Sequence, residues 1–276
     1  MGACKFCGEP AGLLSSAHKE CREAHQRACG SVTALLDSGL NADVPATGLS
    51  RSVQEVSASG RLAATELRKL VLSSMVRWID NALSDHVLSH DEEKRLTDFT
   101  EAFNIENEDI DEVGYKLKLV KALTLRDLSE GQIPKRFKIE GPLPINLTRD
   151  ESIIFVFQNA EYQKMNTRYH YAGRSSGTSV RLMKGVYLKS SGYKGERLKT
   201  DELQSVGKGH LIVTNKNVFF YGPEIVKMPL KKIAGVQPFT DGIAVFKDRE
   251  NAKPAYFMLD DPLYAVNLIS LASSLT

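Results

Sequence analysis

The sequence has few cysteines and lacks the long apolar stretches of a membrane-spanning protein. Its four cysteines all lie within the first 29 residues. None of its apolar runs approaches the roughly 20 residues that a transmembrane helix requires. Cys, Lys and Glu interrupt the first residues, where a signal peptide would have its apolar core. We therefore expect a soluble cytoplasmic protein, and in that reducing compartment clustered cysteines favour a metal site over disulfides.

Charge is unevenly distributed along an otherwise ordinary chain of 276 residues, of which 42% are hydrophobic and 25% are charged. Between Asp80 and Glu112 there are twelve acidic residues and two basic ones. Between Lys164 and Lys208 there are ten Lys and Arg residues and three acidic ones. The simplest interpretation is two solvated faces on separate modules. The functional interpretation is that the two surfaces attract each other or different partners.

The strongest motif lies at the N-terminus, where Cys4 and Cys7 form a Cys-x-x-Cys turn that Gly8 follows. His18 and Cys21 come later and are three residues apart, so on a helix they share a face. Three thiolates and one imidazole in a closed tetrahedral set favour a structural zinc ion and leave no open position for chemistry. The spacing resembles treble-clef and ribbon-type zinc knuckles over about the first 25 to 30 residues.

Two further residues compete for the same metal. His25 lies seven residues after His18, and Cys29 lies eight after Cys21. His25 is otherwise a solvent-facing helical residue and Cys29 a small buried one. The sequence leaves open whether Cys29 or His25 replaces His18 as a ligand.

The middle of the chain has helical periodicity. Ser31–Leu40 predicts a short helix, and a loop rich in Pro, Ser and Gly follows through about Gly60. Apolar residues recur at helical spacing from Arg61 to about Asp85. Ser89 and Glu92 form a capping-box pattern that starts a second helix, and a third begins near Glu108. We expect an antiparallel helical bundle, which is loosely similar to TerB-like helical domains over Arg61–Leu128.

The period changes to two after the Gly and Pro residues at 141–144, and short strands follow with turn signals between them. One predicted hairpin joins Gly209–Thr214 to Asn217–Gly222, and a second turns at Asp241–Gly242. Asp261–Pro262 then predicts the start of a C-terminal helix. Seven or so antiparallel strands with one terminal helix resemble the pleckstrin-homology (PH) superfold, in particular bacterial PH-like and GRAM-like domains. That resemblance implies a fold and no activity.

A basic stretch in this half is a candidate site for an anionic ligand. Its basic residues alternate with tyrosines, and cations beside aromatic rings suit phosphate groups. The alternative is a β-ribbon with one exposed basic face and no ligand. The candidate residues are Arg168, Arg174, Arg181 and Lys184. Residues 173–177 also match the Gly-x-Ser-x-Gly nucleophile pattern formally, but the strand-like residues that follow do not fit that motif.

The sequence therefore predicts a multi-domain α+β protein. The expected parts are a zinc knuckle at 1–30, a short helix and linker at 31–60, a helical bundle at 61–135 and a PH-like antiparallel β-barrel with its C-terminal helix at 145–276. We expect a non-catalytic adaptor or regulatory protein that contains structural zinc and binds another macromolecule, most simply a protein. The alternatives are a nucleic-acid-binding protein that uses the zinc knuckle and the basic β-ribbon, and an unrecognised enzyme. The sequence also leaves open an anionic lipid as a partner. The sequence does not give the oligomeric state.

Overall fold

A computed structural model describes residues 2–276 except 13–14, 43, 135, 137–144, 172–177, 184–185, 191–196 and 251; of residues 85 and 167–201 it describes no side chains. The chain is a mixed α+β protein, as expected. It divides into two compact units, Met1–Arg126 and Asp127–Thr276. The finer division into four parts stays a prediction. None of the helices in the described part of the chain is both long and apolar enough to cross a membrane.

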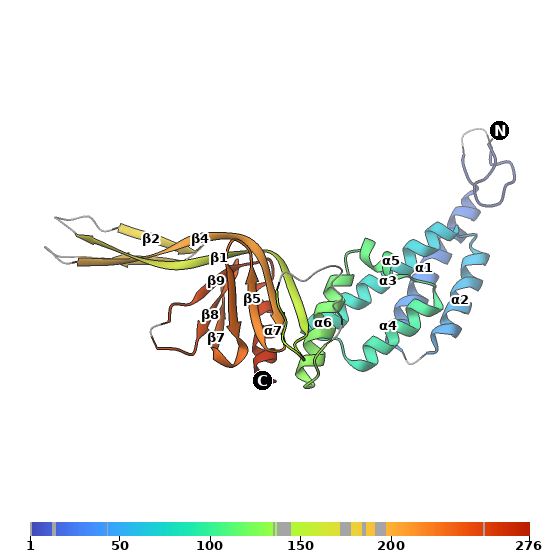
Figure 1. Ribbon diagram of the computed structural model, residues 1–276. Coiled ribbons are helices and arrows are strands. Elements are labelled where there is room, and N and C mark those ends of the chain that lie inside the picture. Colours follow the sequence, from blue (N-terminus) through green and yellow to red (C-terminus); the bar gives the residue numbers. More distant parts are fainter. Residues whose placement is uncertain are drawn as a thin grey trace. The chain divides into compact units, whose positions relative to one another are not determined.

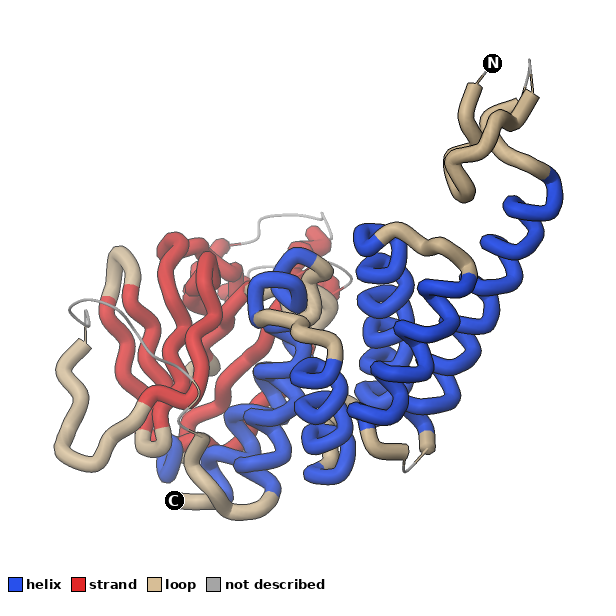
Figure 2. Tube along the Cα trace, turned by 90° about the vertical axis from the view of Figure 1, so that its right-hand side faces the viewer, coloured by secondary structure: helices blue, strands red, loops and turns tan. Residues whose placement is uncertain are grey.

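The N-terminal unit is helical (Figures 1 and 2). Its elements are α1 Lys19–Asn41, α2 Ala46–Ser59, α3 Ala64–Ala82, the 3-10 turn η1 Leu83–Asp85, α4 His90–Ala102, α5 Asn107–Glu112 and most of α6 Lys116–Ser129. The last three residues of α6 are assigned to the C-terminal unit. Helix α1 packs against both α2 and α3. The core between the helices contains Leu36, Met75, Ile79 and Phe99, each at most 2% exposed.

Two expectations for these helices were wrong. Helix α1 begins at Lys19, directly after His18, and continues well before the predicted start at Ser31. Residues 46–59, predicted as a loop, form α2, because Leu49 and Val53 are spaced for one helical face and are buried in the core shared with α1. The abundant Ser, Thr and Gly around them concealed this periodicity.

Other expectations for this unit hold. The capping box at the start of α4 is confirmed, since Ser89 Oγ accepts from the Glu92 amide at 3.3 Å and Glu92 Oε2 accepts from the Ser89 amide at 2.9 Å. The third predicted helix is divided into α5 and α6. Gly114 lies between them with a φ of +76°, a conformation that glycine adopts without steric cost.

The C-terminal unit contains a seven-stranded antiparallel sheet in the order β6-β5-β4-β1-β9-β8-β7, and β2 and β3 form a separate two-stranded sheet. The strands are β1 Ile153–Tyr171, β2 Thr178–Met183, β3 Val186–Ser190, β4 Arg197–Thr214, β5 Asn217–Tyr221, β6 Ile225–Pro229, β7 Ile233–Pro238, β8 Gly242–Lys247 and β9 Ala255–Met258. The 3-10 turn η2 Leu230–Lys232 joins β6 to β7, and helix α7 Pro262–Ser274 follows β9.

The described strands do not form the closed β-barrel that the sequence predicted. Their sheet is open, with β6 and β7 at its edges. These two strands are consecutive in the chain but do not pair as a hairpin. Pro229 ends β6 and has no backbone N–H to donate, and the 3-10 turn η2 redirects the chain between the strands. The expected C-terminal helix is confirmed, and Asp261 caps it by accepting from the Tyr264 amide at 3.2 Å.

Strands β1 and β4 are much longer than the sequence predicted. They pair from Ile153↔Thr214 to Tyr171↔Arg197, whereas β1 pairs with β9 only over Glu161–Lys164. Beyond Lys164, β1 and β4 therefore continue as a ribbon that extends past the seven-stranded sheet (Figure 1). The described part of the predicted basic stretch lies on this ribbon and on strands β2 and β3.

A buried carboxylate holds the start of β1 to the turn between β4 and β5. Glu151, 7% exposed, accepts hydrogen bonds from the Thr148 amide and hydroxyl at 3.0 and 2.9 Å. It also accepts from the Thr214 hydroxyl at 2.8 Å and from the Asn217 side-chain amide at 2.6 Å. Burial alone raises the pKa of Glu151, but these donors, with Asn217 the strongest, outweigh it and leave the pKa below its usual value.

Candidate metal centre

The first two cysteines lie on a tight loop at the N-terminus. The Cys4 amide donates to the Glu9 carbonyl at 2.7 Å, and the Gly8 amide donates to the Cys4 carbonyl at 2.8 Å. Gly8 has a φ of +80°, which lets the chain reverse immediately after Cys7. An antiparallel bridge between Ala3 and Pro10 closes the base of the loop. This backbone holds Cys4 and Cys7 on the same side.

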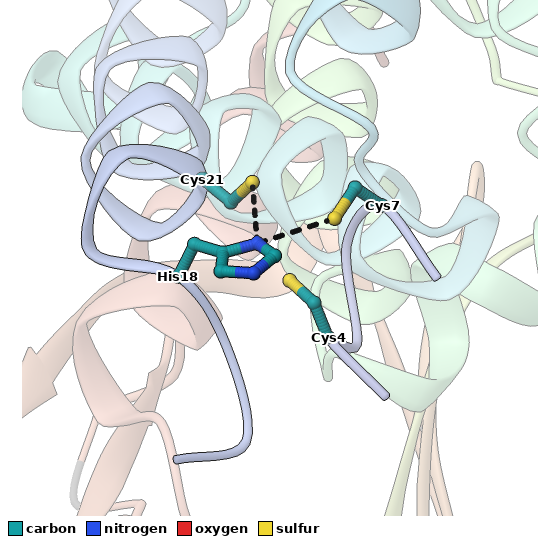
Figure 3. Close-up of side chains that lie close together, drawn as sticks. All are labelled: Cys4, Cys7, His18 and Cys21. Atoms are coloured by element: carbon teal, nitrogen blue, oxygen red, sulfur yellow. Dashed lines mark hydrogen bonds between the residues drawn. The ribbon is translucent and has the colours of Figure 1, made fainter. Parts of the chain in front are cut away.

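The second pair of candidate ligands lies where the chain enters α1. His18 is the residue before the helix, with an extended backbone, and Cys21 lies in the first helical turn. The Lys5 amide donates to the Ser16 carbonyl at 3.0 Å, which ties this segment to the cysteine loop. Figure 3 shows the four side chains converging on one point between the loop and the helix.

The donor atoms of the four side chains lie close enough together to hold a metal ion. Those of Cys4, Cys7, His18 and Cys21 all lie within 4.8 Å of one another. His18 Nδ1 is 3.4 Å from Cys7 Sγ and 3.8 Å from Cys21 Sγ. Around a tetrahedral zinc ion, nitrogen and sulfur ligands are about 3.5 Å apart and two sulfurs about 3.8 Å apart. The cluster could therefore hold a metal ion with only small side-chain shifts.

A backbone carbonyl orients the imidazole. His18 Nε2 lies 3.0 Å from the Pro10 carbonyl oxygen, which can only accept, so Nε2 carries a hydrogen and Nδ1 faces the sulfurs. A metal-binding histidine usually donates its other ring N–H to a carbonyl or carboxylate in this way, which fixes the orientation of the ring. The hydrogen bond to the Pro10 carbonyl is the main cause that raises the pKa of His18, and the hydrogen bond to Cys7 raises this pKa further.

The thiols differ in how readily they ionise. Burial raises the pKa of Cys4, but the backbone N–H groups of Cys7, Phe6 and His18 outweigh it and lower this pKa to about 6. Burial and the neighbouring Cys7 and Cys4 sulfurs raise the pKa of Cys21 to about 11. Three thiolates this close repel one another, so a bound cation is what would allow all three to ionise together.

The structure separates the two competing residues from this cluster. His25 and Cys29 lie farther along α1, and both approach Glu66 in the first turn of α3. The four residues that converge are thus the ones predicted, with His18 in the set. Glu66 had no sequence signal, because it lies 37 residues after Cys29 and reaches α1 only through the packing of α3.

The described part of the chain does not show whether the four residues predicted to bind an anionic ligand lie close together. Arg174 and Lys184 lie outside the described residues, and only the backbone is described for Arg168 on β1 and Arg181 on β2. That site stays a prediction.

Comparisons with known proteins assign the chain to no family. No protein-family model matches it, and neither the curated proteins nor the solved structures contain a significant match to it.

Proposed function

We propose that the chain is a non-catalytic adaptor whose N-terminal knuckle is folded by a structural zinc ion and whose helical and β modules bind another protein. The observation that carries the proposal is the convergence of three thiols and one imidazole from Cys4, Cys7, His18 and Cys21. A set of four protein ligands fills a tetrahedral zinc ion and leaves no position for water or substrate. Such a site stabilises a fold and performs no chemistry.

The knuckle has little else to hold it together. Among the described residues before α1, Cys4 and Ala17 are the buried hydrophobic ones, each 2% exposed. A segment this short with so small a core depends on a metal or another cross-link for its fold. The free energy of zinc binding would then supply the free energy of folding for this segment.

The knuckle also contacts the helices of its own unit. The Phe6 ring lies 4.4 Å from the His25 ring on α1, and Arg61 donates to the Phe6 carbonyl at 3.1 Å. Phe6 lies between the two ligands Cys4 and Cys7, so a metal that fixes the loop also fixes this contact. Zinc would thereby hold the knuckle as part of the helical surface that meets a partner.

The acidic stretch is less available for docking than its charge suggests. At least five of its acidic residues form ion pairs within the N-terminal unit. These pairs are Lys118–Asp80, Arg126–Glu93, Lys94–Asp98, Arg68–Asp109 and Lys116–Asp111. Arg126 is nearly buried, whereas the pairs formed by Lys94, Lys116 and Lys118 are exposed and worth little individually. All five pairs neutralise part of the acidic face.

A groove of about 620 Å³ offers a better binding surface on the same unit. The connection between α1 and α2 forms one side of it, including Val44, which is 50% exposed, and α4 forms the other. Leu49 and Phe99 reach its floor from the buried core, Val44 supplies exposed apolar surface, and Lys94 and Glu101 supply both signs of charge. A groove with apolar and charged side chains side by side suits the amphipathic helix of a partner protein.

We interpret the C-terminal unit as a PH-like module. The first and last strands of its large sheet, β1 and β9, pair at the centre. Outward from β1 the strands follow in chain order (β4, β5, β6), and outward from β9 they follow in reverse chain order (β8, β7). The terminal helix α7 contacts β7 and β8. This antiparallel order with one terminal helix supports the resemblance, whereas the open sheet departs from it. Fold resemblance alone carries no activity.

Affinity capture from the native host tests the adaptor proposal. The variants are Val44→Asp in the groove, Cys7→Ser in the knuckle and Leu117→Asp, a matched change at a 54% exposed position of α6 that does not line the groove. We expect one protein to be retained by wild type and by Leu117→Asp, and to be lost with Val44→Asp and with Cys7→Ser. Retention by all variants would contradict the groove, and capture of no protein would contradict the adaptor role.

Binding to nucleic acid and to anionic vesicles is measured in parallel. Affinity for DNA or RNA that falls steeply as salt rises, without a captured protein, would replace the adaptor with a nucleic-acid-binding function. Affinity for vesicles that contain anionic lipid would replace it with membrane-surface binding.

A further inference from the structure

A second group of metal-ligating side chains lies on the helices, apart from the knuckle. His25 and Cys29 are four residues apart on α1 and so share a helical face. Glu66 approaches both of them from the first turn of α3. His25 Nε2 is 3.0 Å and Cys29 Sγ is 3.9 Å from Glu66 Oε1, and the three ligand atoms all lie within 4.8 Å of one another.

The His25 ring is fixed so that one nitrogen faces this group. Its Nδ1 lies 3.0 Å from the Gly60 carbonyl oxygen, which can only accept, so Nδ1 carries a hydrogen. The Phe6 ring lies 4.4 Å away, and the side chain is 12% exposed. Nε2 therefore points at the Glu66 carboxylate beside the Cys29 sulfur. A carbonyl partner on one nitrogen and acidic ligands at the other is the arrangement of a metal-binding histidine.

We propose that His25 Nε2, Cys29 Sγ and Glu66 Oε1 bind a second divalent transition-metal ion of the zinc class. Around a tetrahedral ion of this kind, nitrogen, oxygen and sulfur ligands lie about 3.3 to 3.5 Å apart. The observed 3.0 and 3.9 Å differ from these values by a few tenths of an ångström. Glu66 is 42% exposed and can make that adjustment without disturbing the core.

This second site differs in kind from the knuckle. Three protein ligands leave the fourth position open to water or an added ligand, as in zinc sites that are not purely structural. Glu66 also gives the ion a route to solvent, so the ion exchanges more readily than one enclosed by four ligands. Because the ligands come from α1 and α3, the ion cross-links the helical unit and stabilises it in proportion to its occupancy.

The competing explanation for the geometry is an ion pair between a protonated His25 and Glu66. That pair satisfies both side chains and needs no contribution from Cys29, whose thiol is a weak hydrogen-bond donor. The metal site requires Cys29 as an ionised ligand, and its formation releases protons. The role of Cys29 therefore separates the two explanations.

Cobalt titration of the metal-free full chain tests the proposal, because thiolate-to-cobalt charge-transfer bands report each Cys ligand. The variants are Cys29→Ser, Glu66→Gln and Cys7→Ser, with Glu55→Gln on the exposed face of α2 as the matched carboxylate control. We expect about two cobalt ions per chain in wild type and in Glu55→Gln, and about one in Cys29→Ser and in Glu66→Gln. Added azide should change the spectrum of wild type and of Cys7→Ser, but not that of Cys29→Ser.

The result that overturns the proposal is a single ion per wild-type chain whose spectrum is unchanged by Cys29→Ser. Circular dichroism establishes that each variant is folded, and the near-isosteric Cys29→Ser and Glu66→Gln test the site independently. Cys7→Ser separates the two centres. An ion retained in Cys7→Ser with a spectrum of one thiolate supports the second site even if the knuckle binds no metal.

Discussion

The buried carboxylate of Glu151 gives a quantitative test of how the C-terminal unit is held together. Glu151→Gln keeps the shape of the side chain but replaces one acceptor oxygen with an NH₂ group. One carboxylate oxygen faces the Thr148 amide and the other faces the Asn217 side-chain NH₂, and both of these groups can only donate. Either orientation of the new amide therefore leaves one donor facing another donor.

The cost follows from the bonds that are lost. An unsatisfied buried donor costs about 1–3 kcal/mol. The remaining hydrogen bonds also weaken, because their acceptor is no longer charged. We therefore expect the free energy of unfolding to fall by about 2–4 kcal/mol. For a unit of this size that corresponds to a fall in melting temperature of roughly 5–15 °C. Glu250→Gln, at an exposed position after β8, is the matched control and should leave the melting temperature unchanged within about 2 °C.

The effect should also depend on pH. The pKa of Glu151 is lower in the folded than in the unfolded protein, so its stabilisation is fully present above the unfolded pKa. It is lost as pH falls through the folded pKa. The difference between wild type and Glu151→Gln should therefore be largest near neutral pH and should narrow below about pH 4, under the usual glutamate pKa.

Differential scanning calorimetry measures this difference, and Trp78 fluorescence assigns the transitions. Trp78 is the single tryptophan and is buried in the N-terminal unit, so a transition without a fluorescence change belongs to the C-terminal unit. The reasoning would be refuted if Glu151→Gln melted within about 2 °C of wild type at neutral pH, or if the difference grew on acidification.

Three further predictions concern the two units. Glu93→Gln removes the ion-pair partner of Arg126, which is 4% exposed, and should destabilise the N-terminal unit by about 1.5–3 kcal/mol in denaturant unfolding followed by Trp78 fluorescence; a change under about 0.5 kcal/mol would contradict it. Gly209→Ala would place a Cβ 2.2 Å from the Tyr221 carbonyl oxygen and should lower the melting temperature of the C-terminal unit; an unchanged value would show that β4 and β5 can separate. A zinc chelator should abolish amide-exchange protection in the knuckle while Trp78 fluorescence stays native; unaltered protection would show that the knuckle folds without metal.

The knuckle could be predicted because its ligands are close in sequence. A Cys-x-x-Cys turn and a His-x-x-Cys helical start bring their donors together by local geometry, and only the meeting of the two pairs depends on tertiary structure. The second group could not be predicted. His25 and Cys29 share a helical face that the sequence shows, but Glu66 joins them only because α3 packs beside α1.

The misplaced elements have similar physical causes. Helix α2 was missed because its Ser, Thr and Gly residues resemble loop composition, whereas tertiary burial of Leu49 and Val53 decides its conformation. The open sheet was missed because closure depends on whether β6 and β7 pair, and no local pattern encodes that. Local turn signals can predict the hairpins β4–β5, β5–β6 and β7–β8, whereas the central pairings of β1 with β4 and with β9 join strands that are far apart in sequence.

The central claim is that the N-terminal residues fold around a zinc ion. The most direct measurement is the metal content of the purified full chain, for wild type and for Cys7→Ser, together with amide-exchange protection of residues 4–21. We predict that wild type holds zinc. Cys7→Ser should hold about one zinc fewer per chain and should lose amide-exchange protection in this segment. A metal-free wild type with a protected N-terminal segment would contradict the claim, and the cysteines would then require a redox explanation.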